Sequence, residues 1–171
     1  MRRGCRWTSA HRTQRLAPER TALQVKIVLS SVRGGKTPWA DQAAGDYGAR
    51  IGRYFGFEER VFKPSTGEDE AARLLEAVPS RAWLVVLDER GASMRSEGLA
   101  KLLEDAAMSG CTPLWFAIGG AFGHSPAVRE RARTVLSLSP MVLNHAVARV
   151  VMLEQIYRAC TIRAGEPYHH A

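Results

Sequence analysis

The sequence has few of the features that define membrane, disulfide-bonded or metal-binding proteins. Its longest uninterrupted apolar run, Ala82–Leu87, has six residues, whereas a membrane-spanning helix needs about 20. Only three cysteines are present, widely separated and without a C-x-x-C pair: Cys5, Cys111 and Cys160. We therefore expect no membrane span, no disulfide framework, and reduced thiols in a cytoplasmic protein. Cys160 lies in an apolar helical pattern, so we expect it to be buried rather than nucleophilic.

Common catalytic signatures are also missing. The five histidines show no metal-ligand spacing, so we expect no metal, and no G-x-S-x-G nucleophile motif occurs. Gly35-Lys36-Thr37 is similar to the end of a phosphate-binding loop, but that pattern requires glycine five residues before Gly35, where the chain has Ser30. A surface turn is the better interpretation of this segment.

Acidic residues are scarce at the N-terminus. Residues 1–22 contain six arginines and one glutamate, which leaves 18 basic and 16 acidic residues for the rest of the chain. Three interpretations remain open: an RNA-binding tail, an organellar transit peptide, or an unstructured extension. A secretory signal is excluded because no apolar segment follows Arg2 and Arg3. We expect a disordered basic extension over residues 1–22 and a single domain over residues 23–171.

The composition is that of an ordinary globular protein, with 46% hydrophobic and 24% charged residues. Strand and helix patterns alternate along the chain. We expect strands over Leu23–Ser30, Phe57–Lys63, Trp83–Asp88, Pro113–Ile118 and Thr134–Leu138, and helices over Pro38–Tyr54, Glu68–Val78, Ser96–Ser109 and Asn144–Arg163, with a further helix after Ser125-Pro126. Such alternation predicts an α/β fold with a mainly parallel sheet flanked by helices.

Three glycines follow one of the predicted buried strands, at Gly119, Gly120 and Gly123. Glycines at the carboxyl end of a strand let a ligand approach the backbone closely. A turn that needs a positive φ angle explains them equally well, so both interpretations stay open.

The last predicted helix is apolar on two sides. Val150, Leu153, Tyr157 and Cys160 share one side, and Val147, Val151 and Ile162 share another. A helix that is apolar on two sides is buried on two sides. The second side can pack within the core or against a second copy of the chain.

Five blocks from Trp83 onward match one known family in order and spacing. They are Leu87-Asp88 with Gly91 and Ser96-Glu97-Gly98-Leu99-Ala100; Ile118-Gly119-Gly120-Ala121-Phe122-Gly123; Leu136-Ser137-Leu138-Ser139 with His145; Arg149–Ala159; and Gly165-Glu166-Pro167-Tyr168-His169. Together they resemble the ribosomal RNA large subunit methyltransferase H family, of the SPOUT class. The resemblance runs from about Leu23 to His170, and residues 1–22 lie outside it.

The resemblance implies a fold and an activity. The fold would be of the SPOUT type, with a trefoil knot near the C-terminus, and the protein would act as a homodimer. The reaction would transfer a methyl group from S-adenosylmethionine to N3 of a pseudouridine in 23S ribosomal RNA. The substrate would be the assembled ribosome rather than naked RNA.

The same resemblance implies site residues. Leu87 and Gly119 would contact the cofactor, and a loop would surround its adenine, formed by Leu138, Ser139, Pro140, Met141, Val142 and Leu143. Arg158, Tyr168 and His169 match positions tied in the family to substrate binding or catalysis. Arg158 would stabilise an anionic base, and His169 would accept its proton or orient it.

One position departs from the family pattern. The family usually has proline before the histidine that matches His145, and this chain has Asn144. Asparagine is a good helix N-cap, so we expect the last helix to begin there all the same. Two other functions remain as alternatives: a non-catalytic ribosome-binding protein with this fold, and a SPOUT methyltransferase acting on another RNA.

Overall fold

The computed structural model describes residues 25–168 and confirms the α/β class. Strands and helices alternate: β1 (Lys26–Val32), α1 (Pro38–Ile51), β2 (Gly56–Phe62), α2 (Gly67–Ala77), β3 (Trp83–Ser93), α3 (Ser96–Met108), β4 (Leu114–Ile118), α4 (Pro126–Arg131), β5 (Thr134–Ser137) and α5 (His145–Ala164). The predicted extension over residues 1–22 lies outside the described residues. None of the helices within residues 25–168 is long and apolar enough to cross a membrane.

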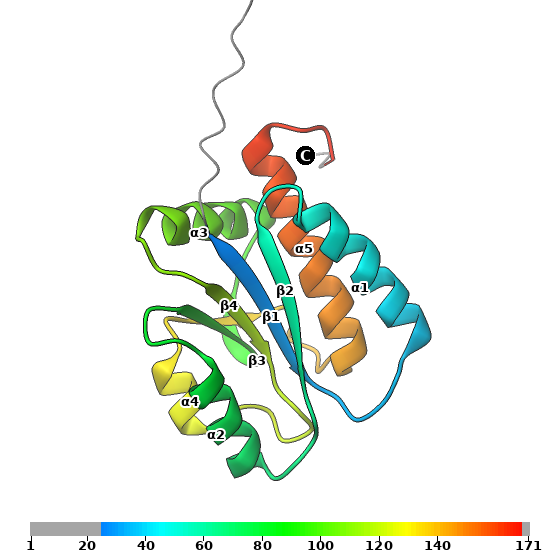
Figure 1. The fold of residues 1–171 in the computed structure, drawn as a ribbon, viewed down its shortest axis with the longest axis vertical. Coiled ribbons are helices and arrows are strands. Elements are labelled where there is room, and N and C mark those ends of the chain that lie inside the picture. Colours follow the sequence, from blue (N-terminus) through cyan, green and yellow to red (C-terminus); the bar gives the residue numbers. More distant parts are fainter. Residues whose placement is uncertain (1–24, 169–171) are drawn as a thin grey trace, which may run out of the picture.

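The five strands form one parallel sheet, in the order β2-β1-β4-β3-β5 (Figure 1). The central strand β4 is buried at all five positions. In β1, every residue after Lys26 is buried. Strands that are covered on both faces must be apolar throughout, which explains the continuous apolar runs in the sequence.

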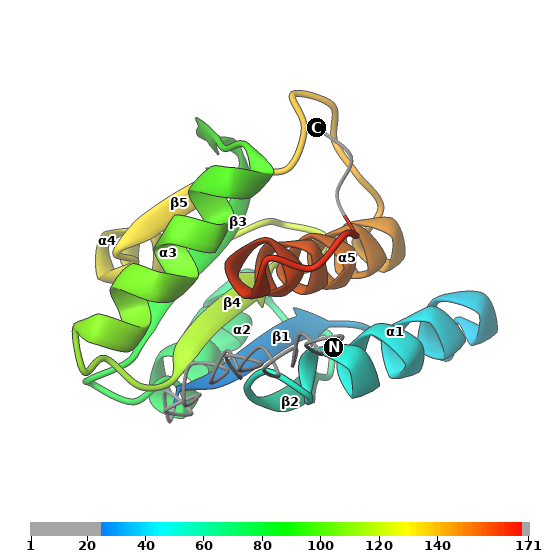
Figure 2. The ribbon, with the colours of Figure 1, turned by 90° about the horizontal axis from the view of Figure 1, so that it is seen from above.

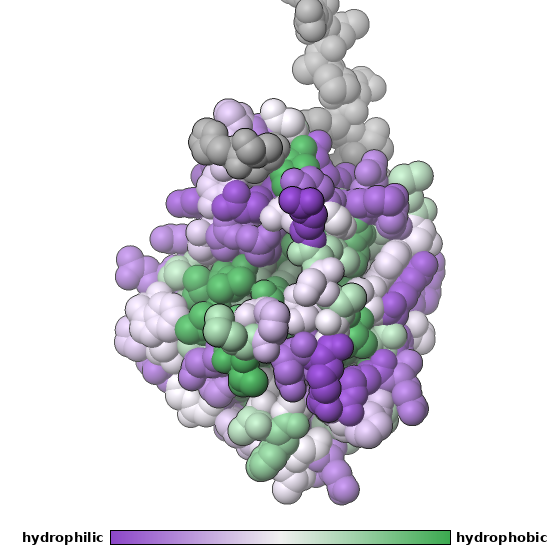
Figure 3. All heavy atoms as spheres, turned by 180° about the vertical axis from the view of Figure 1, so that it is seen from behind, coloured by the Kyte–Doolittle hydropathy of each residue, from purple (hydrophilic) through white to green (hydrophobic). Residues whose placement is uncertain are grey.

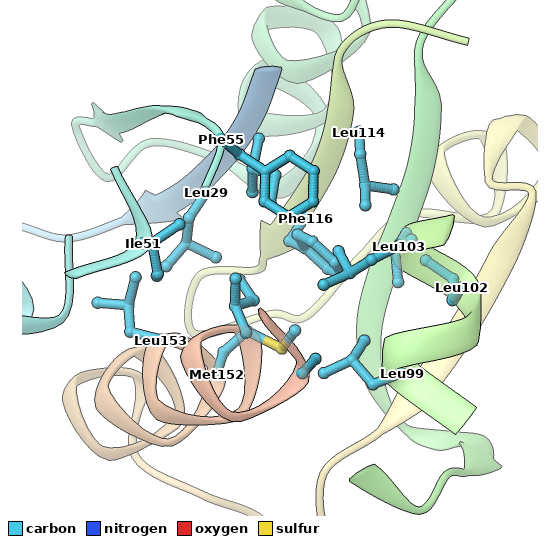
Figure 4. Close-up of a cluster of buried hydrophobic side chains, with 14 of the residues drawn as sticks. Leu29, Ile51, Phe55, Leu99, Leu102, Leu103, Leu114, Phe116, Met152 and Leu153 are labelled. Atoms are coloured by element: carbon cyan, nitrogen blue, oxygen red, sulfur yellow. The ribbon is translucent and has the colours of Figure 1, made fainter. Parts of the chain in front are cut away.

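Helices cover both faces of the sheet (Figures 1 and 2). One core cluster joins the sheet to α1, α3 and α5, and it includes Leu29, Phe116 and Met152 (Figure 4). The other joins the opposite face to α2 and α4, around Trp115. The indole N–H of Trp115 donates to the Ser30 hydroxyl at 2.8 Å, which satisfies both buried polar groups.

Helix α5 lies over the sheet between α1 and α3 (Figure 2). Its inner face is therefore buried within one chain, through Ala148, Met152, Leu153, Ile156, Ala159 and Cys160. Of the two stripes expected from the sequence, only Leu153 and Cys160 are fully buried; Val150, Val151, Tyr157 and Ile162 are half-buried and Val147 is exposed. Core packing accounts for the inner face. Of the second stripe, Ile162 also packs against the core, whereas Val147 faces outward.

Strand β3 is longer than the sequence predicts. We expected it to end at Asp88, but it continues to Ser93 and pairs with β5 again at Ala92, after an irregularity that follows Leu87. Gly91 makes this possible: a Cβ atom there would lie 2.7 Å from the backbone carbon of Leu136. The interruption places residues 88–90 at the edge of the sheet where the site lies.

Candidate functional site

A pocket of about 320 Å³ opens at the carboxyl ends of β3 and β4. The chain leaves β3 into α3 on one face of the sheet and leaves β4 into α4 on the other. Neighbouring parallel strands that diverge in this way leave a crevice where ligands commonly bind. Its lining comes from four segments: Leu87–Arg90, Ile118–Gly123, the loop between β5 and α5, and the first turn of α5.

The sequence-predicted cofactor residues gather at this pocket. Leu87, Gly119, Leu138, Ser139, Met141, Val142 and Leu143 all line it. Pro140 belongs to the same loop but is not among the lining residues.

The loop over residues 138–143 is fixed at both ends. The Ser137 hydroxyl donates to the carbonyl of Ser139 at 2.9 Å, and the Ser139 hydroxyl accepts from the Met141 N–H at 3.0 Å. At the other end, the Asn144 side chain caps α5 by accepting from the Ala146 N–H at 2.8 Å. The expected helix start is thus confirmed without the family's proline.

Apolar side chains of this loop face solvent in the single chain. Met141 is 73% exposed and Val142 is 84% exposed. Across the pocket, Phe122 is 77% exposed. Figure 3 shows apolar side chains gathered near the middle of the face opposite to that of Figure 1. Exposed apolar side chains that border a pocket mark a surface for a ligand or partner.

The glycines after β4 form a tight turn. The Gly123 N–H donates to the Gly120 carbonyl at 3.1 Å, and Gly123 has a φ angle of +67°, which disfavours other residues. A Cβ atom on Gly119 would lie 2.9 Å from the Gly123 backbone. The turn interpretation is therefore confirmed. Position 119 requires glycine because the backbone of Gly123 leaves no room there for a Cβ atom.

Asp88 is a buried, charged residue among those that line the pocket. Its side chain is 2% exposed, and it accepts from the Arg90 N–H and Nε at 3.0 Å and from Arg129 Nη1 at 3.3 Å. Burial alone would raise the pKa of Asp88, but the hydrogen bonds from Arg90 and the charges of both arginines hold it below its usual value. The carboxylate is thus ionised at neutral pH and fixes both arginines.

All four tyrosines of the chain are linked by contacts around the C-terminal half of α5. The Tyr157 ring lies 4.7 Å from the Tyr168 ring, edge to face, and 6.1 and 6.3 Å from those of Tyr47 and Tyr54. Arg158 lies over the Tyr168 ring at 5.0 Å. The structure therefore brings together two of the three residues predicted to act in catalysis, and His169 lies outside the described residues.

Glu154 organises this cluster. Its Oε1 accepts from Arg158 Nη2 at 2.6 Å and from the Tyr168 hydroxyl at 3.4 Å. Burial raises the pKa of Tyr168 to about 12, helped by the Tyr47 hydroxyl and the negative charge of Glu154. At neutral pH Tyr168 is therefore a hydrogen-bond donor and not a phenolate.

Arg158 and the pocket lie apart in one chain. Ala148 lines the pocket, and Arg158 follows it by ten residues in the same helix. At 1.5 Å per residue, about 15 Å of helix separates the two. Arg158 is therefore not among the residues that line the pocket of its own chain.

A family model described as "Predicted SPOUT methyltransferase" matches residues 25–169. The chain belongs to this family of SPOUT methyltransferases. Two relatives named "Ribosomal RNA large subunit methyltransferase H" agree with it. The Trichlorobacter lovleyi protein is 46% identical over 145 residues, which span 80% of this chain and 95% of that protein. The Pelobacter propionicus protein is 45% identical over 139 residues, which span 77% of this chain and 91% of that protein.

Solved structures give more distant similarities to this SPOUT methyltransferase. The TrmH/SpoU tRNA modifying enzyme of A. aeolicus has a TM-score of 0.48 and 15% identity, with 85% of this chain and 81% of that chain covered.

Sequence reasoning missed several residues that line or adjoin the candidate site. Asp88 and Arg129 meet through a contact between β3 and α4, 41 positions apart. Tyr47 and Tyr54 join the cluster from α1 and the turn after it. Residue spacing carries no signal for contacts between separate elements, so only the tyrosine content itself could have pointed to the cluster.

Proposed function

We propose that this chain transfers a methyl group from S-adenosylmethionine to N3 of a pseudouridine in 23S ribosomal RNA within the assembled ribosome. The observation that supports it best is the pocket at the ends of β3 and β4, walled by the apolar loop 138–143, in a chain of the SPOUT family. The names of the relatives supply the ribosomal RNA. The cytoplasm would be its compartment.

The pocket residues fit S-adenosylmethionine. A volume of about 320 Å³ lies in the range of small-molecule sites. Leu138 and Leu143 pack against the main core, so the wall is firm where an adenine face would rest. Met141 and Val142 are exposed and free to cover that ring. Backbone groups of Gly119–Gly123 and of the loop can satisfy polar edges.

The chain's own residues would position the base and stabilise its charge. The bound cofactor supplies a methyl group on a sulfonium, which needs little activation, so in-line placement of the base is the main task. N3 carries a proton, and its loss leaves an anionic ring. Arg158 would stabilise that anion, and Tyr168, protonated at neutral pH, would donate a hydrogen bond to it. His169 would accept the proton or orient the base.

A homodimer would complete the site. Because about 15 Å of helix separates Arg158 from the pocket, the second chain would have to bring its own Arg158 and Tyr168 there. The exposed Val147 and the half-buried Val151 offer apolar surface on α5 for that association. The trefoil knot likewise stays a prediction of the family resemblance.

Transfer of label tests the function directly. Purified protein, ribosomes from a strain that lacks the gene, and S-adenosylmethionine with a labelled methyl group should place one label in 23S RNA, and mass analysis of digested RNA should locate it on pseudouridine N3. A ribosome-binding protein without activity would bind the particles and transfer nothing. An enzyme for another RNA would label purified tRNA instead.

A further inference from the structure

A second, smaller pocket of about 100 Å³ adjoins the first. It lies where β1 ends, and it is lined by the segment 31–37 and by His145, Ala146 and Arg149 of α5. His145 lines both pockets. Whatever binds in the second pocket would therefore lie beside a ligand of the first.

The charges around this pocket are not balanced. Arg149 forms ion pairs with Glu59 and, at 2.7 Å, with Asp41. Arg33 forms an ion pair with the same Asp41, also at 2.7 Å. These pairs hold both guanidinium groups in place. Lys36 is exposed and has no ion pair within residues 25–168. The pocket thus keeps one positive charge with no counter-charge.

Several hydrogen-bond donors at the pocket also lack partners. Ser31 is 2% exposed, yet among the described residues its hydroxyl has no hydrogen-bond partner, and the same holds for Arg33 Nε. In the exposed loop that follows, the N–H groups of residues 34–36 donate no hydrogen bond to any described residue. A buried polar group without a partner is unfavourable, so such a group at a pocket points to a ligand that pairs with it.

An aromatic side chain stands next to this loop. Trp39, in the first turn of α1, is 54% exposed. Exposed aromatic rings beside basic loops are platforms on which unpaired bases stack. Uncompensated positive charge, free donors and a stacking ring are together the features of a single-stranded RNA contact.

We propose that the second pocket binds a backbone phosphate of the RNA substrate, next to the nucleotide in the first pocket. Phosphate oxygens would accept hydrogen bonds from the loop N–H groups, and also from the Ser31 hydroxyl and Arg33 Nε once a small side-chain movement exposes these enclosed atoms. Lys36 would supply the charge. The inference rests on the proposed function, since the phosphate belongs to the RNA that is methylated. It assigns a positioning role to the Gly35-Lys36-Thr37 segment.

The Lys36→Met variant tests the charge. Methyl transfer to ribosomes should show a KM about tenfold higher. The slope of log KM against log salt concentration should fall by the amount expected for the loss of about one phosphate contact. The matched control is Lys101→Met, since Lys101 is an exposed lysine on α3, paired with Asp105. It should leave both quantities unchanged, and both variants should bind S-adenosylmethionine as the wild type does.

The Ser31→Ala variant separates binding from structure. It removes a buried hydroxyl that has no partner among the described residues, so the melting temperature should stay the same or rise. If the hydroxyl holds a phosphate, KM for ribosomes should still rise several-fold. An unchanged KM in both Ser31→Ala and Lys36→Met, with an active wild type, would overturn the phosphate site.

Two further outcomes have distinct meanings. If the wild type transfers no methyl group to any RNA, the proposed function fails, whereas loss of RNA binding in Lys36→Met by filter binding would still support the phosphate site. Calorimetry with inorganic phosphate and with AMP distinguishes the source of the phosphate. Tight saturable binding of either, lost in Lys36→Met, would assign the pocket to a free phosphate compound and overturn the RNA assignment.

Discussion

At the scale of single residues, Asp88 shows how a buried charge shapes the pocket. Its carboxylate joins β3, at the interruption that follows Leu87, to α4 through Arg129 and holds Arg90 at the rim of the pocket. Such a group stabilises the fold only while it is ionised. The pKa of Asp88 is lower in the folded chain than in the unfolded chain. The contribution of Asp88 to the free energy of unfolding is therefore complete above the ordinary carboxyl pKa of about 3.9, and it is lost as the pH falls through the pKa of the folded chain.

The first prediction follows from the direction of this pKa shift. Asp88→Asn should lower the melting temperature at pH 7, because two arginines lose their counter-charge. The difference between variant and wild type should begin to shrink as the pH falls below about 4, where Asp88 of the unfolded chain takes up a proton, and should vanish only below the lower pKa of the folded chain. Thermal unfolding measured from pH 3 to pH 8 checks it. A difference that stays constant across this range would contradict the role assigned to the charge.

The second prediction concerns Gly119. A Cβ atom there would lie 2.9 Å from the Gly123 backbone, so Gly119→Ala should displace the turn that lines the pocket. We expect affinity for S-adenosylmethionine to fall by about tenfold, which is about 1.4 kcal/mol. The control is Gly45→Ala on α1, where a Cβ atom has no neighbour within 4 Å. Calorimetry should find the control's affinity unchanged; equal affinity in both variants would place the cofactor elsewhere.

At the scale of elements, the start of α5 connects the fold to the site. Asn144 caps this helix directly after the loop 138–143, and both pockets use the first turn. The third prediction is that Asn144→Ala lowers the free energy of unfolding by about 1 kcal/mol, because one helix N–H loses its partner. Chemical denaturation measures this.

Two further substitutions, Asn144→Asp and Asn144→Pro, sharpen the test of the cap. An aspartate side chain also accepts a hydrogen bond at the N-cap, so the stability of Asn144→Asp should equal that of the wild type. Proline, the residue usual in the family, cannot cap with its side chain but stiffens the loop, so it should raise cofactor affinity relative to Asn144→Ala. If Asn144→Ala unfolds like the wild type, the hydrogen bond to Ala146 contributes nothing.

The sequence predicted the elements well where the pattern is local. Helix α3 was expected over Ser96–Ser109 and ends one residue earlier, and β5 was expected over Thr134–Leu138 and also ends one residue earlier. The continuation of β3 past Asp88 was missed, because Arg90-Gly91 has the composition of a turn. Only the backbone of Leu136, on another strand, shows why Gly91 belongs to a strand.

The candidate site was predictable in part. Seven of the eight cofactor residues named from the family resemblance do line one pocket. The contacts of Asp88 with Arg129, and of Tyr168 with Tyr157, depend on strand order and helix packing, which residue patterns do not specify. The free donors of the second pocket were equally hidden, since a serine or a glycine has no signature until its hydrogen bonds are known.

At the scale of the whole molecule, the proposed active site divides into two half-sites within one chain. The pocket lies at the start of α5, and the Arg158–Tyr168 pair lies near its end. A two-fold axis between two antiparallel α5 helices would place the start of each helix beside the end of the other. The pocket of one chain would then lie near Arg158 and Tyr168 of the second chain. The outward apolar residue Val147 and the half-buried Val151 lie on the face of α5 that such packing would use. Val151→Arg should therefore give monomers in sedimentation and lose activity while each chain stays folded.

The last prediction tests the shared site by mixing two inactive variants. Gly119→Val damages the pocket, and Arg158→Ala removes the positive charge at the other half-site. A dimer of both variants would combine the pocket of the Arg158→Ala chain with Arg158 of the Gly119→Val chain. After subunit exchange in equal amounts, half the dimers are mixed and each has one of two sites complete, so about a quarter of wild-type activity should return. The control mixes Gly119→Val chains with differently tagged Gly119→Val chains; every dimer then lacks an intact pocket, so this mixture should gain nothing. If exchange is confirmed by mass and the first mixture stays inactive, each chain completes its own site and the dimer has another role.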